Sequence, residues 1–116
     1  MPETLTFILI EVTKSEIRFM SKKNSKVISK NNKFKKSENV SNLFKYFLNY
    51  YKLNFYKISH VFYNININNN IIRRNFLTFI KTVNLLKKVT IIEISKEDLK
   101  KYKKKLNNNY KSISNV

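Results

Sequence analysis

The sequence contains no cysteine, no glycine, no alanine and no tryptophan, and it has one proline among 116 residues. Without cysteine, the chain forms no disulfide and no thiolate metal site. Without glycine, it lacks the loops that bring a backbone close to a nucleotide phosphate. The abundant residue types, lysine, asparagine, isoleucine, phenylalanine and tyrosine, have A/T-rich codons, whereas the absent types mostly have G/C-rich ones. We therefore expect a very A/T-rich genome, and an organelle genome fits best.

Acidic residues are also scarce, with 7 of them against 24 lysines and arginines, for a formal net charge of +17. A compact domain with this charge repels itself, so we expect a polyanionic partner to be part of its stable state. Nucleic acid is the leading class of partner, and a solvated lysine surface is the ordinary alternative.

A membrane role is not indicated. The apolar run LTFILI, residues 5–10, is too short to span a bilayer and has no basic residue before it, which argues against a signal peptide or a membrane span. No basic amphipathic helix stands apart from the expected core, so we expect no association with a membrane surface.

The residues that catalysis or metal binding would need are not arranged for either. Glu97 and Asp98 are adjacent, but they follow an expected strand and are predicted to form a solvated turn. His60 is the only histidine, so it has no second imidazole or thiolate with which to share a metal, and packing is favoured. No serine stands in an order that would make a catalytic triad with it. We expect no enzymatic activity and no cofactor.

The first third of the sequence has the apolar runs of short strands. Residues 5–12 and 16–21 are rich in isoleucine, phenylalanine, leucine and valine, and residues 26–29 form a shorter run. Polar KS and KKNS segments separate the runs, which predicts an antiparallel meander. The next segment, KNNKFKK at 30–36, carries four lysines without a helical period and is predicted to be a basic loop.

The rest of the sequence alternates between helical and strand periods. A helix is predicted from an N-cap at Ser37 or Ser41 to about Leu53, and KISHVFYNININ, residues 57–68, has the clearest two-residue alternation. A second helix and a last strand, VTIIEI at 89–94, follow. The apolar positions expected to face the core from the two helices are Val40, Phe44, Phe47, Tyr51, Ile72, Phe76, Phe79, Ile80 and Val83.

These elements predict one α/β domain over residues 1–99, with a mixed β-sheet and two helices in the order βββαβαβ. Residues 100–116 are dense in lysine and have no core-forming period, so we expect an extended basic C-terminal tail that is disordered without its partner. Tyr102 and Tyr110 lie among these lysines, where their rings either stack on bases or sugars or stay in a disordered chain.

The stretch ININNNIIRRN, residues 65–75, joins the clearest strand to the second helix. Asparagine is the non-glycine residue that most readily adopts left-handed backbone conformations, so Asn68–Asn70 is predicted to make the turn. That turn would bring the first amides of the helix, with their partial positive charge, beside Arg73 and Arg74. The combination predicts a site for a nucleic-acid phosphate, and the alternative is that both arginines only solvate the first turn.

Strand, turn, arginine, helix, strand and basic tail together resemble the small-subunit ribosomal protein family numbered eleven. That family has a motif VxVKGPGxGR before a helix. Here residues 65–68 fall on VxVK, residues 69–73 on GPGxG, and Arg74 on the family arginine. EIRFMSKKNSKVIS resembles the family's hairpin, KFKKSENVSNLF its loop into the first helix, and IEIS the end of its last strand. The resemblance implies a ribonuclease-H-like fold on the platform of the small ribosomal subunit, bound to rRNA near the messenger exit.

The sequence departs from that family at several positions. The family's glycines are absent, Asn75 replaces the acidic residue after the arginine, and the ending HNGCRPPK is only a lysine run after Asp98. Three other classes stay open, of which peripheral membrane association would require liposome binding that survives moderate salt. The large-subunit family numbered eighteen also packs antiparallel strands against two helices, but it should end soon after the second one. A DNA-binding protein of an organelle nucleoid would bind duplex DNA and dimerise.

The resemblance implies a structural, non-enzymatic protein of an organelle ribosome, mitochondrial and organelle-encoded, with a relic plastid as the alternative. Its implied partners are the small-subunit rRNA, neighbouring platform ribosomal proteins and mRNA near the exit, with no membrane and no homo-oligomer. The residues predicted to bind RNA lie in the basic loop, the asparagine turn and the tail: Lys30, Lys33, Lys35, Lys36, Asn68, Asn69, Asn70, Arg73, Arg74, Lys100, Lys101, Tyr102, Lys103, Lys104, Lys105 and Lys111.

Overall fold

The computed structural model describes residues 6–14, 16–23, 26–33, 39–66 and 70–114, with Thr6 and 107–114 described by their backbone alone. Within these ranges, five strands and three α-helices follow one another in the order βββαβαβα, with a short 3-10 turn, η1, before β4. The elements are β1 (Thr6–Val12), β2 (Glu16–Lys23), β3 (Lys26–Lys33), α1 (Val40–Tyr50), η1 (Phe55–Lys57), β4 (Ile58–Ile65), α2 (Asn70–Leu86), β5 (Thr90–Glu93) and α3 (Lys96–Ser114).

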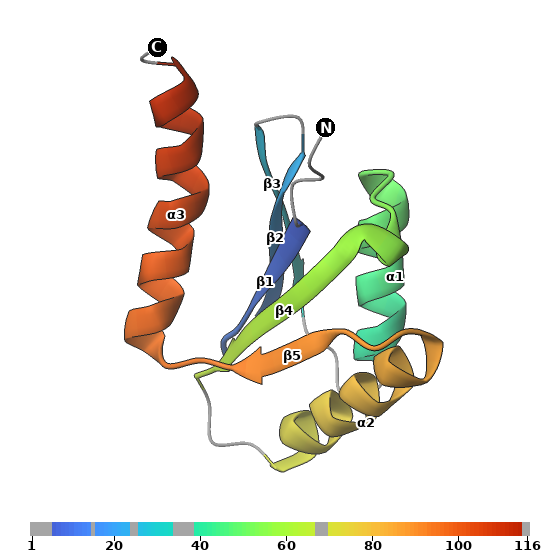
Figure 1. Ribbon diagram of the computed structural model, residues 1–116. Helices are drawn as coiled ribbons and strands as arrows, with labels where there is room; N and C mark the ends of the chain where they lie inside the picture. Colours follow the sequence, from blue (N-terminus) through green and yellow to red (C-terminus); the bar gives the residue numbers. More distant parts are fainter. Residues whose placement is uncertain (1–5, 15, 24–25, 34–38, 67–69, 115–116) are drawn as a thin grey trace.

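The five strands form one mixed sheet in the spatial order β3-β2-β1-β4-β5 (Figure 1). β1, β2 and β3 pair antiparallel as the predicted meander, whereas β4 pairs parallel with β1, and β5 parallel with β4. Parallel strands need a crossover between them, and α1 and α2 lie in the connections that lead to β4 and β5. The predicted α/β fold, with its mixed sheet and the order βββαβαβ up to β5, is confirmed.

α1 and α2 cover one face of the sheet (Figure 1). Phe44 and Phe47 of α1 and Phe76 and Phe79 of α2 are all buried, as their helical spacing predicts. The ring of Phe47 stacks on that of Phe19 in β2, with centroids 5.5 Å apart. The main core therefore lies between these two helices and the sheet.

α3 covers the opposite face, so the prediction of an extended, disordered tail is wrong (Figure 1). Leu99 and Leu106 are each 2% exposed and pack with Leu9 of β1. Together with Tyr102, they give the helix one apolar side, which is sufficient to cover a sheet face that would otherwise expose leucine. Lysine has a good helix propensity, so the lysine-rich run stays helical once this side is docked. The helix crosses the domain boundary expected at residues 99–100.

The start of α3 includes the two acids that were predicted to form a solvated turn. Ser95 Oγ accepts a hydrogen bond from the backbone N–H of Asp98 at 3.1 Å. Glu97 and Asp98 lie in the first turn, where the helix dipole favours negative charge. The turn prediction is wrong because Ser-Lys-Glu-Asp is a helix start, with a hydroxyl at the N-cap and an acid three residues later.

β3 is longer than predicted. Lys30 and Lys33, expected in a basic loop, pair with Phe19 and Glu16 of β2. Pairing along the whole of β2 overrides the low strand propensity of lysine and asparagine. The rest of the expected loop, 34–36, with the predicted RNA-binding residues Lys35 and Lys36, lies outside the described residues.

α1 begins one residue after Asn39, whose side chain accepts a hydrogen bond from the backbone N–H of Ser41 at 2.8 Å. The N-cap is therefore Asn39 and neither of the predicted serines, Ser37 and Ser41. Asparagine caps a helix as well as serine does, so residue type alone could not separate these positions.

The end of α1 is closed without glycine and comes earlier than the predicted Leu53. Lys52 has a left-handed φ of 53°. The backbone N–H of Leu53 donates to the carbonyl of Leu48 at 2.8 Å, which completes a Schellman arrangement. Lys23 of β2 adds its Nζ, which donates to the carbonyls of Tyr51 at 2.6 Å and Lys52 at 3.3 Å.

β4 is covered on both faces. Val61, Tyr63 and Ile65 belong to the main core, as the alternation of the sequence predicts. Phe62 belongs to the cluster under α3, and Asn64 is also buried, with its Nδ2 donating to the carbonyl of Ile94 at 2.8 Å. β4 is thus an interior strand, between β1 and β5, with α1 and α2 on one side and α3 on the other.

Candidate functional site

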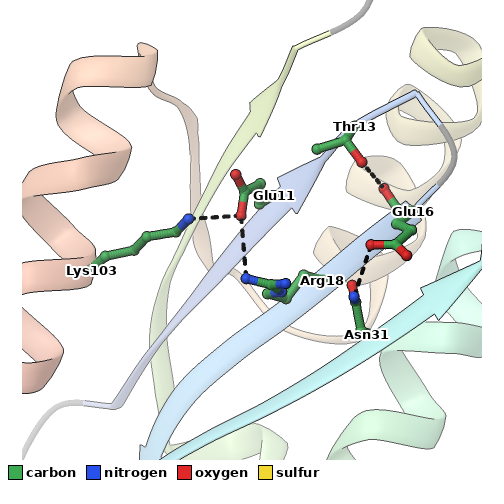
Figure 2. Close-up of polar contacts among 6 residues, drawn as sticks. All are labelled: Glu11, Thr13, Glu16, Arg18, Asn31 and Lys103. Carbon is green, nitrogen blue, oxygen red and sulfur yellow. Dashed lines mark hydrogen bonds and ion pairs between the residues drawn. The ribbon is translucent and has the colours of Figure 1, made fainter.

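Glu11 of β1 is the centre of an ion-pair cluster on the α3 side of the sheet. Lys103 of α3 donates to Glu11 Oε1 at 2.8 Å, and Arg18 Nη1 of β2 lies 4.0 Å from the same oxygen (Figure 2). The Glu11 side chain is 21% exposed, so solvent only partly screens these pairs. Lys103 thus helps to hold α3 on the sheet, and its predicted contact with RNA stays a prediction.

Glu16, at the start of β2, is also engaged within the protein. Its carboxylate accepts a hydrogen bond from Asn31 Nδ2 of β3 at 2.8 Å (Figure 2). Its carbonyl oxygen accepts a bond from Thr13 Oγ1 at 3.4 Å. These bonds connect the turn after β1 to the far end of β3.

Four lysines, Lys100, Lys101, Lys104 and Lys105, are exposed on α3, away from the buried Leu99 and Leu106. We call these four residues the α3 lysine face. No acidic residue interrupts the sequence between the two leucines. Like charges four residues apart on a helix repel each other, at a cost of a few tenths of a kcal/mol per pair. Among the described residues none of these four lysines forms an ion pair, so the face is a strip of positive charge held on a docked helix.

Tyr102 does not share the exposure of these lysines. Its ring stacks on Phe62 of β4 with centroids 4.4 Å apart, and it meets Phe7 of β1 edge-on at 5.9 Å. The ring is thus an apolar group that docks α3, and its predicted contact with RNA stays a prediction. Lys111 and Tyr110 belong to the part of α3 described by its backbone alone.

The two arginines of the predicted phosphate site have different surroundings. Arg73 Nη1 lies 3.5 Å from Glu93 Oε2 of β5, and both side chains are 45% exposed. Arg74 is exposed and has no ion-pair partner among the residues that the structure describes. Asn70 is the first residue of α2, and Asn68 and Asn69 lie outside the described ranges. The phosphate site stays a prediction in which Arg74, more than Arg73, supplies the guanidinium.

Lys30 of β3 lies over two tyrosines of α1. Its Nζ is 4.8 Å from the ring centroid of Tyr46 and 4.6 Å from that of Tyr50. The two rings are 6.3 Å apart at an angle of 28°, and the residues are 55% and 61% exposed. These tyrosines were not predicted to be functional. The signal that could have found them is their four-residue spacing, which is offset from the buried positions Phe44 and Phe47.

Another lysine donates inside the fold, like Lys23 at the end of α1. Lys87, just after α2, donates its Nζ to the carbonyls of Tyr56 and, at 3.1 Å, Ile58. These contacts join the end of α2 to the start of β4. Lys23 and Lys87 therefore have structural roles, in contrast to the exposed lysines of α3.

His60 packs as predicted. Its ring stacks on Phe62 with centroids 5.7 Å apart, and its Nδ1 lies 2.8 Å from Ser59 Oγ. In the described part of the chain, no three His, Cys, Asp or Glu side chains gather as metal ligands would. Nor is any described helix long and apolar enough to cross a bilayer.

No protein-family profile matches the sequence, and a comparison with curated proteins finds no significant match. Solved structures do share the fold. YeaZ from Pseudomonas aeruginosa superposes with a TM-score of 0.65 at 5% identity, covering 79% of this chain and 43% of that one. An uncharacterized protein with similarity to peptidase YEAZ from Pseudomonas aeruginosa gives the same TM-score and identity, with coverages of 79% and 44%. The chain spans less than half the length of these structures, and the likeness shows the fold, which is ribonuclease-H-like α/β as predicted.

The same comparison contradicts the predicted function. The structural neighbours are YeaZ-like proteins and not small-subunit ribosomal proteins, so the assignment as a structural, rRNA-binding constituent of the ribosome is wrong. The resemblance was carried by the order of strands, helices and basic turns, and one fold of this kind hosts many functions. Neither the large-subunit family nor the nucleoid protein gains support from these structures.

Proposed function

We propose that the chain is a non-catalytic basic domain that binds the phosphate backbone of a nucleic acid through surface lysines. The observation that carries the proposal is the α3 lysine face, whose four lysines form no ion pair with the described residues, because acids elsewhere in the fold have other partners. Glu11 and Glu93 are paired within the protein, with Lys103 and Arg73 among their partners, and the carboxylate of Glu16 is bonded to Asn31.

The geometry of the α3 lysine face suits a polymer more than a single small anion. Lys100 and Lys104 are separated by about 6 Å along the helix axis, and so are Lys101 and Lys105. Lysines spaced in this way can contact successive phosphates of a nucleic-acid backbone. Each neutralised phosphate releases counterions, which drives binding at low salt. Bound phosphates would also remove the repulsion between the lysines. Because α3 is docked through buried leucines, its lysines are presented without the cost of ordering a loose chain.

The test is the salt dependence of binding, measured by fluorescence anisotropy with a labelled single strand of about 20 nucleotides. Replacing the four lysines of the α3 lysine face by glutamine should reduce the slope of log affinity against log salt by about 3, since each contact to a single strand contributes roughly 0.7.

The matched control removes the same charge elsewhere, at four exposed lysines outside α3. It is the quadruple glutamine variant of Lys14, Lys57, Lys81 and Lys88. Its slope should stay closer to that of the native chain. Equal losses in the two variants would mean that only total charge matters, and native protein without salt-dependent binding would refute the function itself.

A further inference from the structure

Lys30, Tyr46 and Tyr50 form a surface that phosphate contacts alone do not explain. Two large aromatic side chains, each more than half exposed, lie next to each other on α1 under one ammonium group. We propose that this tyrosine platform (Lys30, Tyr46 and Tyr50) stacks the unpaired bases of a single-stranded nucleic acid. The proposal rests on the proposed function and adds a second contact surface, on the α1 side of the sheet and opposite α3, together with the kind of strand that is bound.

The platform is anchored to the core through a third tyrosine. The Tyr51 ring meets Tyr50 edge-on at 4.9 Å and Phe47 edge-on at 5.3 Å. The Tyr51 hydroxyl donates to the carbonyl of Ser29 in β3 at 2.7 Å. α1 and β3, and with them Tyr50 and Lys30, are thereby held in a fixed relation. A base would meet a preformed aromatic surface and so would bind at a lower entropic cost.

The charge around the platform fits the backbone that would carry such bases. Lys26 of β3, four positions from Lys30 and so on the same side of the strand, is exposed, and so is Lys45 of α1, next to Tyr46 in the sequence. In the sequence, Glu38 is the only acidic residue between Arg18 and Ile92. A strand whose bases reach the tyrosines would therefore have lysines beside its phosphates. A duplex offers phosphates as well, but its bases are stacked on each other and present no free ring face.

The simpler alternative is that Lys30 and the tyrosines only stabilise one another. A cation over exposed aromatic rings is a common contact and requires no ligand. The two explanations differ in one property, because only a stacking platform distinguishes a strand with bases from a strand without them.

The experiment compares a labelled oligothymidylate with an abasic strand of the same length and phosphate count. Native protein should bind the dT strand at least roughly tenfold more tightly, which is the size expected for stacking one base. The double variant Tyr46→Leu and Tyr50→Leu should bind both strands equally and keep the salt slope of the native chain. Two controls should retain the preference: Tyr46→Phe with Tyr50→Phe, which keeps the rings, and Tyr56→Leu, which removes another exposed tyrosine.

A direct readout uses the absence of tryptophan from the chain. Tyr46→Trp creates a single indole, whose fluorescence should be quenched by the dT strand and not by the abasic one. Equal binding of the two strands by native protein, with an intact salt slope, would overturn the platform and leave phosphate binding in place. Binding of neither strand would instead refute the proposed function on which the platform rests. Unchanged far-UV circular dichroism establishes that each variant is folded.

Discussion

Truncating Leu106 to alanine tests whether α3 is part of the folded domain. Leu106 is 2% exposed and belongs to a cluster with Leu9, Phe62 and Leu99. Buried leucine-to-alanine changes cost about 2–5 kcal/mol, through lost transfer free energy and the cavity that is left. This cluster is the smaller of the two cores, so we expect a value near 2–3 kcal/mol. A domain of this size has a total stability on the order of 5–15 kcal/mol, so the change is a large fraction of it.

The measurement is urea unfolding at neutral pH, followed by far-UV circular dichroism. The control is Lys104→Ala, on the exposed side of the same helix, which should alter the free energy of unfolding by no more than about 0.5 kcal/mol. If Leu106→Ala and Lys104→Ala have the same stability, α3 contributes nothing to the fold. The end of the chain would then be the extended tail that the sequence first indicated.

Three other outcomes follow from the structure. Lys52→Gly should stabilise the protein by about 1 kcal/mol in urea unfolding, because glycine adopts the left-handed φ freely, whereas Lys45→Gly inside α1 should destabilise it by a similar amount; the same sign for both would contradict this. Burial raises the pKa of Tyr63, so above about pH 10 this phenol loses its proton in the unfolded chain before it does so in the folded one. The free energy of unfolding therefore falls as the pH rises toward the folded pKa, and Tyr63→Phe should make that fall less steep in urea unfolding measured against pH. Arg74→Ala should lower the salt slope of oligonucleotide binding by about one contact, and Arg73→Ala by less because its guanidinium is ion-paired; equal effects would remove the distinction between them.

Elements with closely repeated apolar residues were predicted from the sequence, whereas α3, which has few apolar residues, was not. α1 and α2 carry phenylalanines at helical spacing, and β4 alternates, so their existence and buried faces were predicted correctly. α3 has Leu99, Tyr102 and Leu106 among lysines, a pattern that gains meaning only once the sheet is known to need a second cover. Interior strands that run parallel to a neighbour are usually covered on both faces. The available hint was Phe62, which lies between His60 and Asn64 on the otherwise polar face of the alternating strand.

The candidate site was predictable as a set of charges and not as a set of contacts. The lysine run of α3 is visible in the sequence, but Lys103 pairs with Glu11, which is 92 positions away, and no local pattern shows this. Likewise, Lys30 is basic in the sequence, yet its place over Tyr46 and Tyr50 depends on how β3 lies against α1. Which lysines are free to contact a ligand therefore depends on the tertiary structure.

The ammonium groups of Lys23 and Lys87 donate hydrogen bonds to main-chain carbonyls. They therefore count toward the net charge of the chain but not toward the number of cations that can contact a phosphate. A carbonyl accepts the hydrogen bond without cancelling the charge, so both lysines still add to the field that a distant polyanion experiences. Neither can reach a phosphate without leaving its carbonyls. The rate of encounter should therefore follow the full net charge of the chain, while the number of counterions released on binding follows only the exposed lysines and arginines. Stopped-flow association and equilibrium titration would accordingly report different effective charges for the same protein.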